Sequence, residues 1–215
     1  MTRNPAKAQG FSLLELIIVL GLVSAILGVV LSTLMEGDRV SMLGRQESEM
    51  RQQLRDILTL MAKELRRAGL PPLNAYDGHY LRSSGKLNLV SRGILPESHS
   101  TRLTFTGDIN ADNRVDYVVY AVSGATPPLT LTRRAGPIGD AGTLPGGPPQ
   151  TLSRRVVICR FSYFDASGVA TSRAAEAASV RIDLTLRSRV PDLSSGHHRT
   201  LSRSVRVTPY NLRPR

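Results

Sequence analysis

The stretch FSLLELIIVLGLVSAILGVVLSTLM, from Phe11 to Met35, decides how this chain is organised. As an α-helix it would be about 37 Å long, because each residue adds about 1.5 Å, and the hydrocarbon core of a bilayer is about 30 Å thick. The apolar region of a secretory signal peptide is shorter, about 7–15 residues, and a small-residue cleavage site follows it. We therefore expect residues 11–35 to form a transmembrane helix rather than an ordinary signal peptide.

The charges before this stretch predict its orientation. Arg3 and Lys7 precede it, with no acidic residue to balance them. Positive charge is retained on the cytoplasmic side of a membrane segment, so the N-terminus should lie in the cytoplasm. The rest of the chain then lies outside the cytoplasm, anchored by a single pass.

One acidic residue, Glu15, interrupts the apolar stretch and is the single charge between Ala8 and Met35. A carboxylate in a lipid-embedded helix is costly and usually has a dedicated partner. No neighbouring residue in the sequence carries a positive charge that could serve. A plain membrane anchor therefore does not explain this glutamate.

The sequence GFSLLEL, from Gly10 to Leu16, follows a short basic leader and resembles the cleavage and methylation signal of type IV prepilins and pseudopilins. The resemblance implies that residues 1–10 are a leader peptide, that a prepilin peptidase cuts between Gly10 and Phe11, and that the new Phe11 amine is N-methylated. It also implies that Glu15 pairs with the N-terminal ammonium of a neighbouring subunit, an attraction that the low dielectric of lipid would strengthen. The expected location is the inner membrane, with the body of the chain on the extracytoplasmic side, and then a pilus or pseudopilus.

Small residues in the apolar stretch predict contacts with other helices. Gly21 with Ala25, and Ser24 with Gly28, form two pairs of small residues spaced four apart, which let helices approach closely in lipid. We expect these positions to pack against other pilin or pseudopilin subunits.

The helix should continue beyond the membrane as an amphipathic segment over residues 36–69. Apolar residues recur at spacings of three and four, with Glu47 in one slot of the series. The series comprises Val40, Leu43, Met50, Leu54, Ile57, Met61, Leu65 and Ala68. Gly69, followed by Pro71 and Pro72, predicts the end of the helix. Two separate helices, or a soluble coiled coil, are the alternatives.

Residues 70–215 show β-strand patterns and predict a globular head. Alternating apolar and polar residues mark six strands: Arg102–Thr106, Val115–Val122, Leu129–Arg133, Val156–Phe164, Val180–Leu186 and Leu201–Val207. An antiparallel sheet with one wet face would bury its other face on the apolar stripe of the helix. The predicted fold class is therefore α+β, a long N-terminal helix packed against an antiparallel sheet. The segment Gly136–Pro149, rich in glycine and proline, should be an exposed loop.

The head carries no constellation typical of an enzyme. No G-x-S-x-G, H-E-x-x-H, phosphate-binding loop or dinucleotide fingerprint occurs in the chain. His79, His99, His197 and His198 lie among loop-forming residues without metal-ligand spacing. The lone Cys159 lies in an apolar run typical of a buried strand. We expect no catalytic residues and no enzymatic activity.

One segment has the spacing of a calcium-binding loop of the EF-hand type. The oxygen-bearing residues at its first, third, fifth and ninth places are Asp108, Asn110, Asp112 and Asp116. Asn113 stands where such loops prefer glycine, but Val119 replaces the bidentate glutamate of the twelfth place, and the flanks show strand patterns rather than helices. The alternatives are a weak calcium site and a solvated turn rich in aspartate and asparagine. No other cofactor is expected.

The basic charge of the chain favours anionic partners. The net charge is +11, and the stretch from Arg187 to Arg215 contains seven arginines against Asp192 alone. DNA is one such partner, although a DNA-binding tract would interleave aromatic residues with the charge, and Tyr210 is the only aromatic residue there. Solvated strand faces are the alternative explanation.

The expected function is structural: a minor subunit that helps initiate or cap an inner-membrane-assembled filament of the type IV pilus kind. The segment Gln53–Leu70 also resembles PilW-type minor pilins and the J-type pseudopilins of type II secretion, which serve protein export. A pilin whose head captures DNA for competence, or adheres to a surface, is the other alternative. The expected partners are other pilin or pseudopilin subunits and a prepilin peptidase.

Overall fold

The computed structural model describes residues 12–71, 93–138, 148–192 and 195–212, with the side chains of residues 38–40 and 212 excepted. Contacts within the chain divide it into two compact units, Met1–Arg45 and Gln46–Arg215. The predicted cleavage site at Gly10 and Phe11 lies outside the described residues, as do residues 139–147 of the predicted loop.

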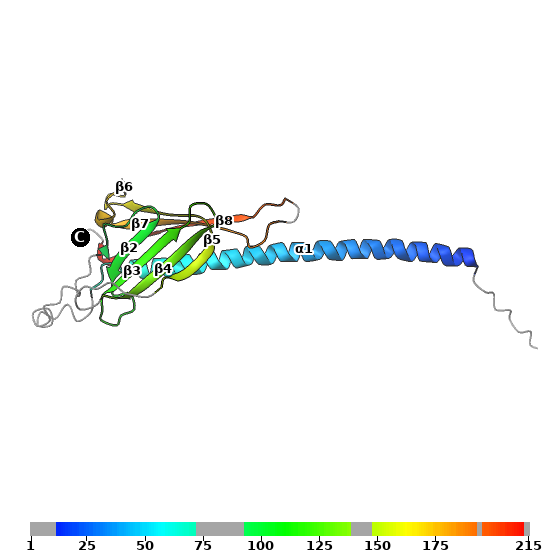
Figure 1. The fold of residues 1–215 in the computed structure, drawn as a ribbon, viewed down its shortest axis with the longest axis horizontal. Helices are drawn as coiled ribbons and strands as arrows, with labels where there is room; N and C mark the ends of the chain where they lie inside the picture. The colour runs from blue at the N-terminus through cyan, green and yellow to red at the C-terminus, as the bar shows by residue number, and fades with distance from the viewer. Residues whose placement is uncertain (1–11, 72–92, 139–147, 193–194, 213–215) are drawn as a thin grey trace, which may run out of the picture. The chain divides into compact units, whose positions relative to one another are not determined.

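A single helix, α1 (Leu13–Arg66), contains both the apolar stretch and the amphipathic segment (Figure 1). The structure has no break within these bounds, so the alternative of two separate helices is wrong. The turn that follows is where the sequence predicts the helix to end. Gly69 adopts a φ of +80°, in the left-handed region that favours glycine at the end of a helix.

Eight strands of the second unit form one antiparallel sheet (Figure 1). The strands are β1 (Gly93–Ile94), β2 (Arg102–Gly107), β3 (Asp116–Ser123), β4 (Leu129–Pro137), β5 (Gln150–Phe164), β6 (Ala170–Thr171), β7 (Ser179–Arg187) and β8 (Thr200–Val207). Their order in the sheet is β1-β2-β3-β4-β5-β7-β8, and β6 pairs with β5. All six predicted strands are confirmed. The two-residue strands β1 and β6 escape prediction because so short a segment cannot display an alternating pattern.

The apolar stripe of α1 within the second unit packs on one face of the sheet. Its buried members are Met50, Leu54, Ile57, Met61, Leu65 and Ala68. All of these except Met50 join the core that contains Phe105, Tyr120 and Phe161 from the strands. Farther toward the N-terminus Leu43 is only partly buried. Helix and sheet thus bury one shared core, and the α+β fold class is confirmed.

Strand β7 shows how closely burial follows the sequence pattern. Val180, Ile182 and every second residue onward are buried, while Arg181 is exposed. Thr185 is an exception on the solvent-exposed face, since it is buried. Its hydroxyl group forms a hydrogen bond with the Ser202 hydroxyl (2.7 Å) on β8. Cys159 on β5 is buried as predicted, and burial raises the pKa of its thiol to about 12, so the thiol is neutral and unreactive.

The end of β2 lies directly against the end of the helix. A Cβ atom at Gly107 would lie 2.3 Å from the carbonyl oxygen of Arg67, so only glycine fits there. The Gly69 N–H donates to the Thr106 carbonyl (2.9 Å), and the Asp108 N–H donates to the Leu70 carbonyl (3.0 Å). These contacts hold the start of the β2–β3 turn in one place relative to the sheet and the helix end.

Candidate functional site

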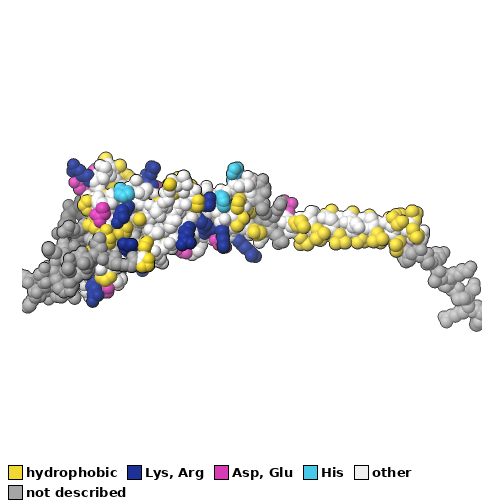
Figure 2. Space-filling model, in the orientation of Figure 1, with side chains coloured by type: hydrophobic (Ala, Val, Ile, Leu, Met, Phe, Trp, Pro, Cys, Tyr) yellow, Lys and Arg dark blue, Asp and Glu magenta, His cyan; other side chains and the backbone are white. Residues whose placement is uncertain are grey.

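The apolar half of α1 is exposed in the first unit. The exposed fractions of its large hydrophobic side chains range from 46% at Val23 to 77% at Leu13. Figure 2 shows hydrophobic side chains along the length of this half, with backbone and other side chains between them. The helix is long and apolar enough to cross a membrane. It therefore presents to its surroundings an apolar surface that residues 12–45 do not cover themselves.

Glu15 lies in the first turn of α1, and its side chain is exposed. A carboxylate in the first turn interacts favourably with the helix dipole, but this contributes only about 0.3–1 kcal/mol. Among the described residues, no basic side chain forms an ion pair with it. Any full countercharge for Glu15 must therefore come from outside the described part of the chain.

The four small residues of the apolar half, Gly21, Ser24, Ala25 and Gly28, are also exposed. A Cβ atom at Gly21 or Gly28 would meet no heavy atom within 4 Å. The Ser24 hydroxyl donates to the Leu20 carbonyl (2.8 Å), which satisfies it within the helix. These positions are open to a neighbouring helix, and the packing predicted for them is not supplied by the described residues of this chain.

The turn between β2 and β3 brings together three of the four predicted calcium ligands. One carboxylate oxygen from each of Asp108, Asp112 and Asp116 lies within 4.8 Å of the other two. Asp108 and Asp116 are each only 2% exposed, whereas Asp112 is exposed. Within the part of the chain that the structure describes, no histidine or cysteine belongs to such a group.

Backbone amides hold Asp108 in place. Its Oδ1 accepts a hydrogen bond from the Ala111 N–H (2.7 Å), and its Oδ2 accepts one from the Asn113 N–H (3.2 Å). The chain turns around it through two residues with a φ of +64°, Ala111 and Asn113. Asparagine adopts this left-handed conformation more readily than other residues with a side chain, whereas the Cβ of Ala111 makes it unfavourable there.

The fourth predicted ligand, Asn110, is oriented differently. Its side-chain oxygen accepts the Asp112 N–H (3.2 Å), and its Nδ2 donates to Oδ2 of Asp112 (2.9 Å). Asn110 therefore braces Asp112 in this structure, and its amide oxygen would have to turn to act as a ligand. Asp112 also accepts the Arg114 N–H at its Oδ1 (2.9 Å).

Asp116 is the unbalanced member of the group. Its Oδ2 is buried and has no hydrogen-bond partner among the described residues. Burial, together with the charges of Asp112 and Asp108, raises the pKa of the Asp116 carboxyl to about 6. Its charged form is therefore disfavoured, and no ion pair with a described residue compensates the charge.

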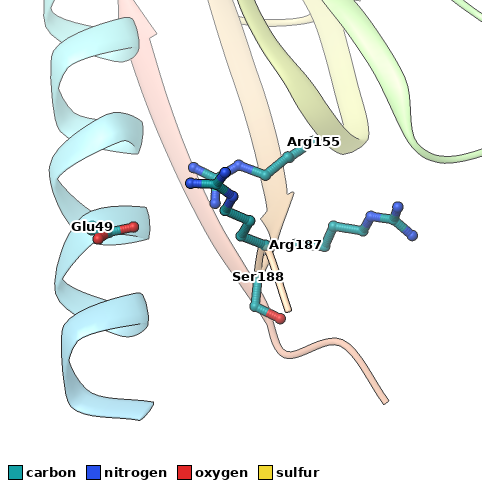
Figure 3. Close-up of a pocket in the computed structure, with 5 residues that line it drawn as sticks. Glu49, Arg155, Arg187 and Ser188 are labelled. Carbon is teal, nitrogen blue, oxygen red and sulfur yellow. The ribbon is translucent and has the colours of Figure 1, made fainter. Parts of the chain in front are cut away.

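A second polar site in residues 46–215 is an open pocket of about 440 Å³ lined by Glu49, Arg155, Arg187, Ser188 and Arg189. Figure 3 shows the guanidinium groups of Arg155 and Arg187 close together and directed toward α1. Arg155 donates to the Gln53 side-chain oxygen (2.5 Å), so part of its hydrogen-bonding capacity is already used. The pocket is basic but is partly balanced by Glu49.

The arginine-rich C-terminal stretch is partly engaged in internal contacts. Arg199 pairs with Asp192 (3.0 Å). The Arg206 guanidinium lies 4.2 Å from the ring centroid of Phe164, and its Nε donates to the Ser179 hydroxyl (3.0 Å). Two of the seven arginines in this stretch, Arg199 and Arg206, therefore have partners within the chain.

Glu64 is only 6% exposed and is not among the site residues predicted from the sequence. Its Oε2 accepts hydrogen bonds from the Tyr120 hydroxyl (2.5 Å) and from Nε of Arg133 (3.0 Å), and its Oε1 accepts one from Nη2 of Arg133 (2.5 Å). The sequence feature that indicates its burial is the helical spacing, because Glu64 falls three residues after Met61 and four before Ala68 on the buried stripe. Its role is to join α1 to β3 and β4.

Comparison of the chain with protein-family models and with curated proteins finds no match.

Proposed function

We propose that this chain is a minor pilin or pseudopilin, a structural subunit of an inner-membrane-assembled filament of the type IV pilus kind. The observation that carries the proposal is an exposed, apolar helix with one carboxylate, Glu15, in its first turn. An apolar surface of this length needs lipid or other apolar helices around it. The unpaired carboxylate needs a positive charge, which the freed amine of a neighbouring subunit would supply.

The sequence around Gly10 supports how that amine would arise. Cleavage by a prepilin peptidase after Gly10 would make Phe11 the first residue, four positions before Glu15. Phe11 of one subunit would then lie near Glu15 of the next, with the two charges in a medium of low dielectric. The open positions at Gly21 and Gly28 would let the helices of adjacent subunits approach closely.

The head has a different role in this proposal. The second unit has its own hydrophobic core, which helix and strands share. The subunit acts by position, helping to initiate or cap the filament, in pilus biogenesis or in protein export as a J-type pseudopilin. The chemistry of the helix is the same in both systems.

Mass spectrometry of the mature N-terminus tests the proposal directly. Cells that contain a prepilin peptidase should yield a chain that begins at N-methylated Phe11, and Gly10→Val should leave the full-length chain uncleaved. An intact chain starting at Met1 in such cells would contradict the proposal. Glu15→Val should insert into the membrane and be processed normally but enter sheared filaments poorly, whereas Ser12→Ala serves as a control that should assemble normally.

A further inference from the structure

We propose that the β2–β3 turn is a calcium site, in which Asp108, Asp112 and Asp116 together bind a single Ca²⁺ ion, each through one carboxylate oxygen. This site is independent of the membrane helix, and neither the filament proposal nor its test depends on it.

The distances fit a shared ion. Ca²⁺ binds oxygen ligands at about 2.3–2.6 Å, so two ligands of one ion can be at most about 5 Å apart. The three carboxylate oxygens lie within 4.8 Å of one another. Three like charges this close repel one another unless a cation lies among them.

The buried oxygen of Asp116 is the independent observation that points to a ligand. Asp116 is only 2% exposed, and its Oδ2 has no hydrogen-bond partner in the described chain. A buried carboxylate is strongly destabilising unless it is paired or coordinates a metal. No arginine or lysine among the described residues forms an ion pair with Asp108, Asp112 or Asp116. A bound cation would supply both a partner for Oδ2 of Asp116 and a countercharge for the three carboxylates.

One basic side chain, that of Arg67, binds the backbone of the turn rather than its carboxylates. Arg67 extends from the end of α1 to the same turn, but its Nη1 donates to the Ile109 carbonyl (2.9 Å). It thereby fixes the backbone of the turn and forms no ion pair with the three aspartates. The site keeps its negative charge while its backbone is held by the helix.

The turn is built in advance for binding. Both oxygens of Asp108 are held by backbone amides, and an ionised carboxylate has lone pairs left for an ion after accepting two hydrogen bonds. The close approach of Gly107 to Arg67 fixes the entrance of the turn, and Asp116 is fixed as the first residue of β3. Only Asp112 is exposed, so the ion would reach the site from that side.

The donor atoms select the type of metal. Three carboxylates without histidine or cysteine suit a hard cation, and Ca²⁺ tolerates irregular geometry and completes its shell with carbonyls and water. Mg²⁺ demands a nearly ideal octahedron. Val119, at the place of the bidentate glutamate, is buried in β3, so the affinity should fall in the weak range of about 10⁻⁴–10⁻³ M.

Isothermal titration of the full-length chain in detergent with CaCl₂ tests the site. We expect one Ca²⁺ per chain. In Asp112→Asn the affinity for Ca²⁺ should fall by about tenfold or more, because fewer ligand charges weaken binding. Asp112 is exposed, so this variant should fold normally. The control is Asp165→Asn, since Asp165 accepts the same kind of backbone hydrogen bonds, from Ser167 and Val169, in the β5–β6 turn but belongs to no acidic group.

Thermal unfolding of the same protein supplies a second, crossed measurement. In CaCl₂ the wild-type chain should unfold at a higher temperature than in EGTA. Asp116→Asn should unfold in EGTA at or above the wild-type temperature, because the substitution removes a repelling charge, and should gain nothing from CaCl₂. Absence of Ca²⁺ binding by the wild-type chain at 10⁻² M, on the order of ten times the weakest expected dissociation constant, would overturn the proposal. So would equal Ca²⁺ binding by Asp112→Asn, or tighter binding of Mg²⁺ than of Ca²⁺.

Discussion

The two ends of α1 are both rich in apolar residues, but those residues are exposed at one end and buried at the other. Leucine, isoleucine and valine dominate residues 13–35, and all of their side chains are exposed, whereas Leu54, Met61 and Leu65 near the other end are almost completely buried. The second group is covered by the sheet of its own chain. The first group has no such cover within the described residues. Apolar composition therefore says that a surface must be covered, but not by what.

The same contrast appears in the two glutamates of this helix. Glu64 is buried and has Arg133 and Tyr120 as partners from two strands. Glu15 is exposed and has no ion-pair partner among the described residues. One carboxylate is neutralised within the fold, and the other is left for a partner that we place in a neighbouring subunit. Three substitutions test these differences between the two ends of the helix. They are given in order of the expected effect on the stability of the head.

Arg133→Met should have the largest effect. It leaves the Glu64 carboxylate buried without its countercharge, and breaking a buried pair in this way costs about 3–5 kcal/mol. The free energy of unfolding can be measured in full-length protein in detergent from tyrosine fluorescence, since Tyr117, Tyr120 and Tyr163 are buried in the head.

The matched control for this variant is the double substitution Glu64→Gln with Arg133→Met. It removes both charges but keeps an acceptor for the Tyr120 hydroxyl, so it should recover at least half of the lost stability. If the single variant lost less than about 1 kcal/mol, Glu64 would not depend on Arg133.

Leu65→Ala should have a somewhat smaller effect, about 2–4 kcal/mol, because a fully buried leucine leaves a cavity when it is shortened. Leu22→Ala removes the same atoms from the exposed half of the helix, where the leucine is 60% exposed. This second variant should leave the unfolding of the head unchanged. Similar losses in both variants would mean that the two halves of α1 share one core.

Glu15→Gln should have the smallest effect on the head, with no measurable change in its unfolding. Its consequence should appear only in assembly, as a reduced share of the subunit in sheared filaments relative to the membrane fraction. Glu15→Asp keeps the charge and is expected to assemble better than Glu15→Gln. A destabilised head in Glu15→Gln would show that Glu15 acts within its own chain.

Much of the fold is predictable because its signals are local. The period of the apolar stripe predicts the amphipathic helix, Gly69 with the two prolines predicts its end, and alternation predicts the six longer strands. The spacing of the aspartates also predicts that they share one turn. Glu64 is harder to recognise, because a glutamate at a stripe position is compatible with solvent until Arg133 and Tyr120 are known to lie opposite.

The sequence by itself determined the apolar stretch, the single carboxylate within it, and the order of helix and strands, because these depend on residues close together in the chain. Only the tertiary structure decided which groups meet across the chain. It pairs Glu64 with Arg133, 69 residues away, and docks the end of α1 on Gly107. It also buries Asp116 beside two other aspartates with one oxygen unpaired. Burial and long-range pairing follow from how the sheet closes over the helix, which no local pattern specifies.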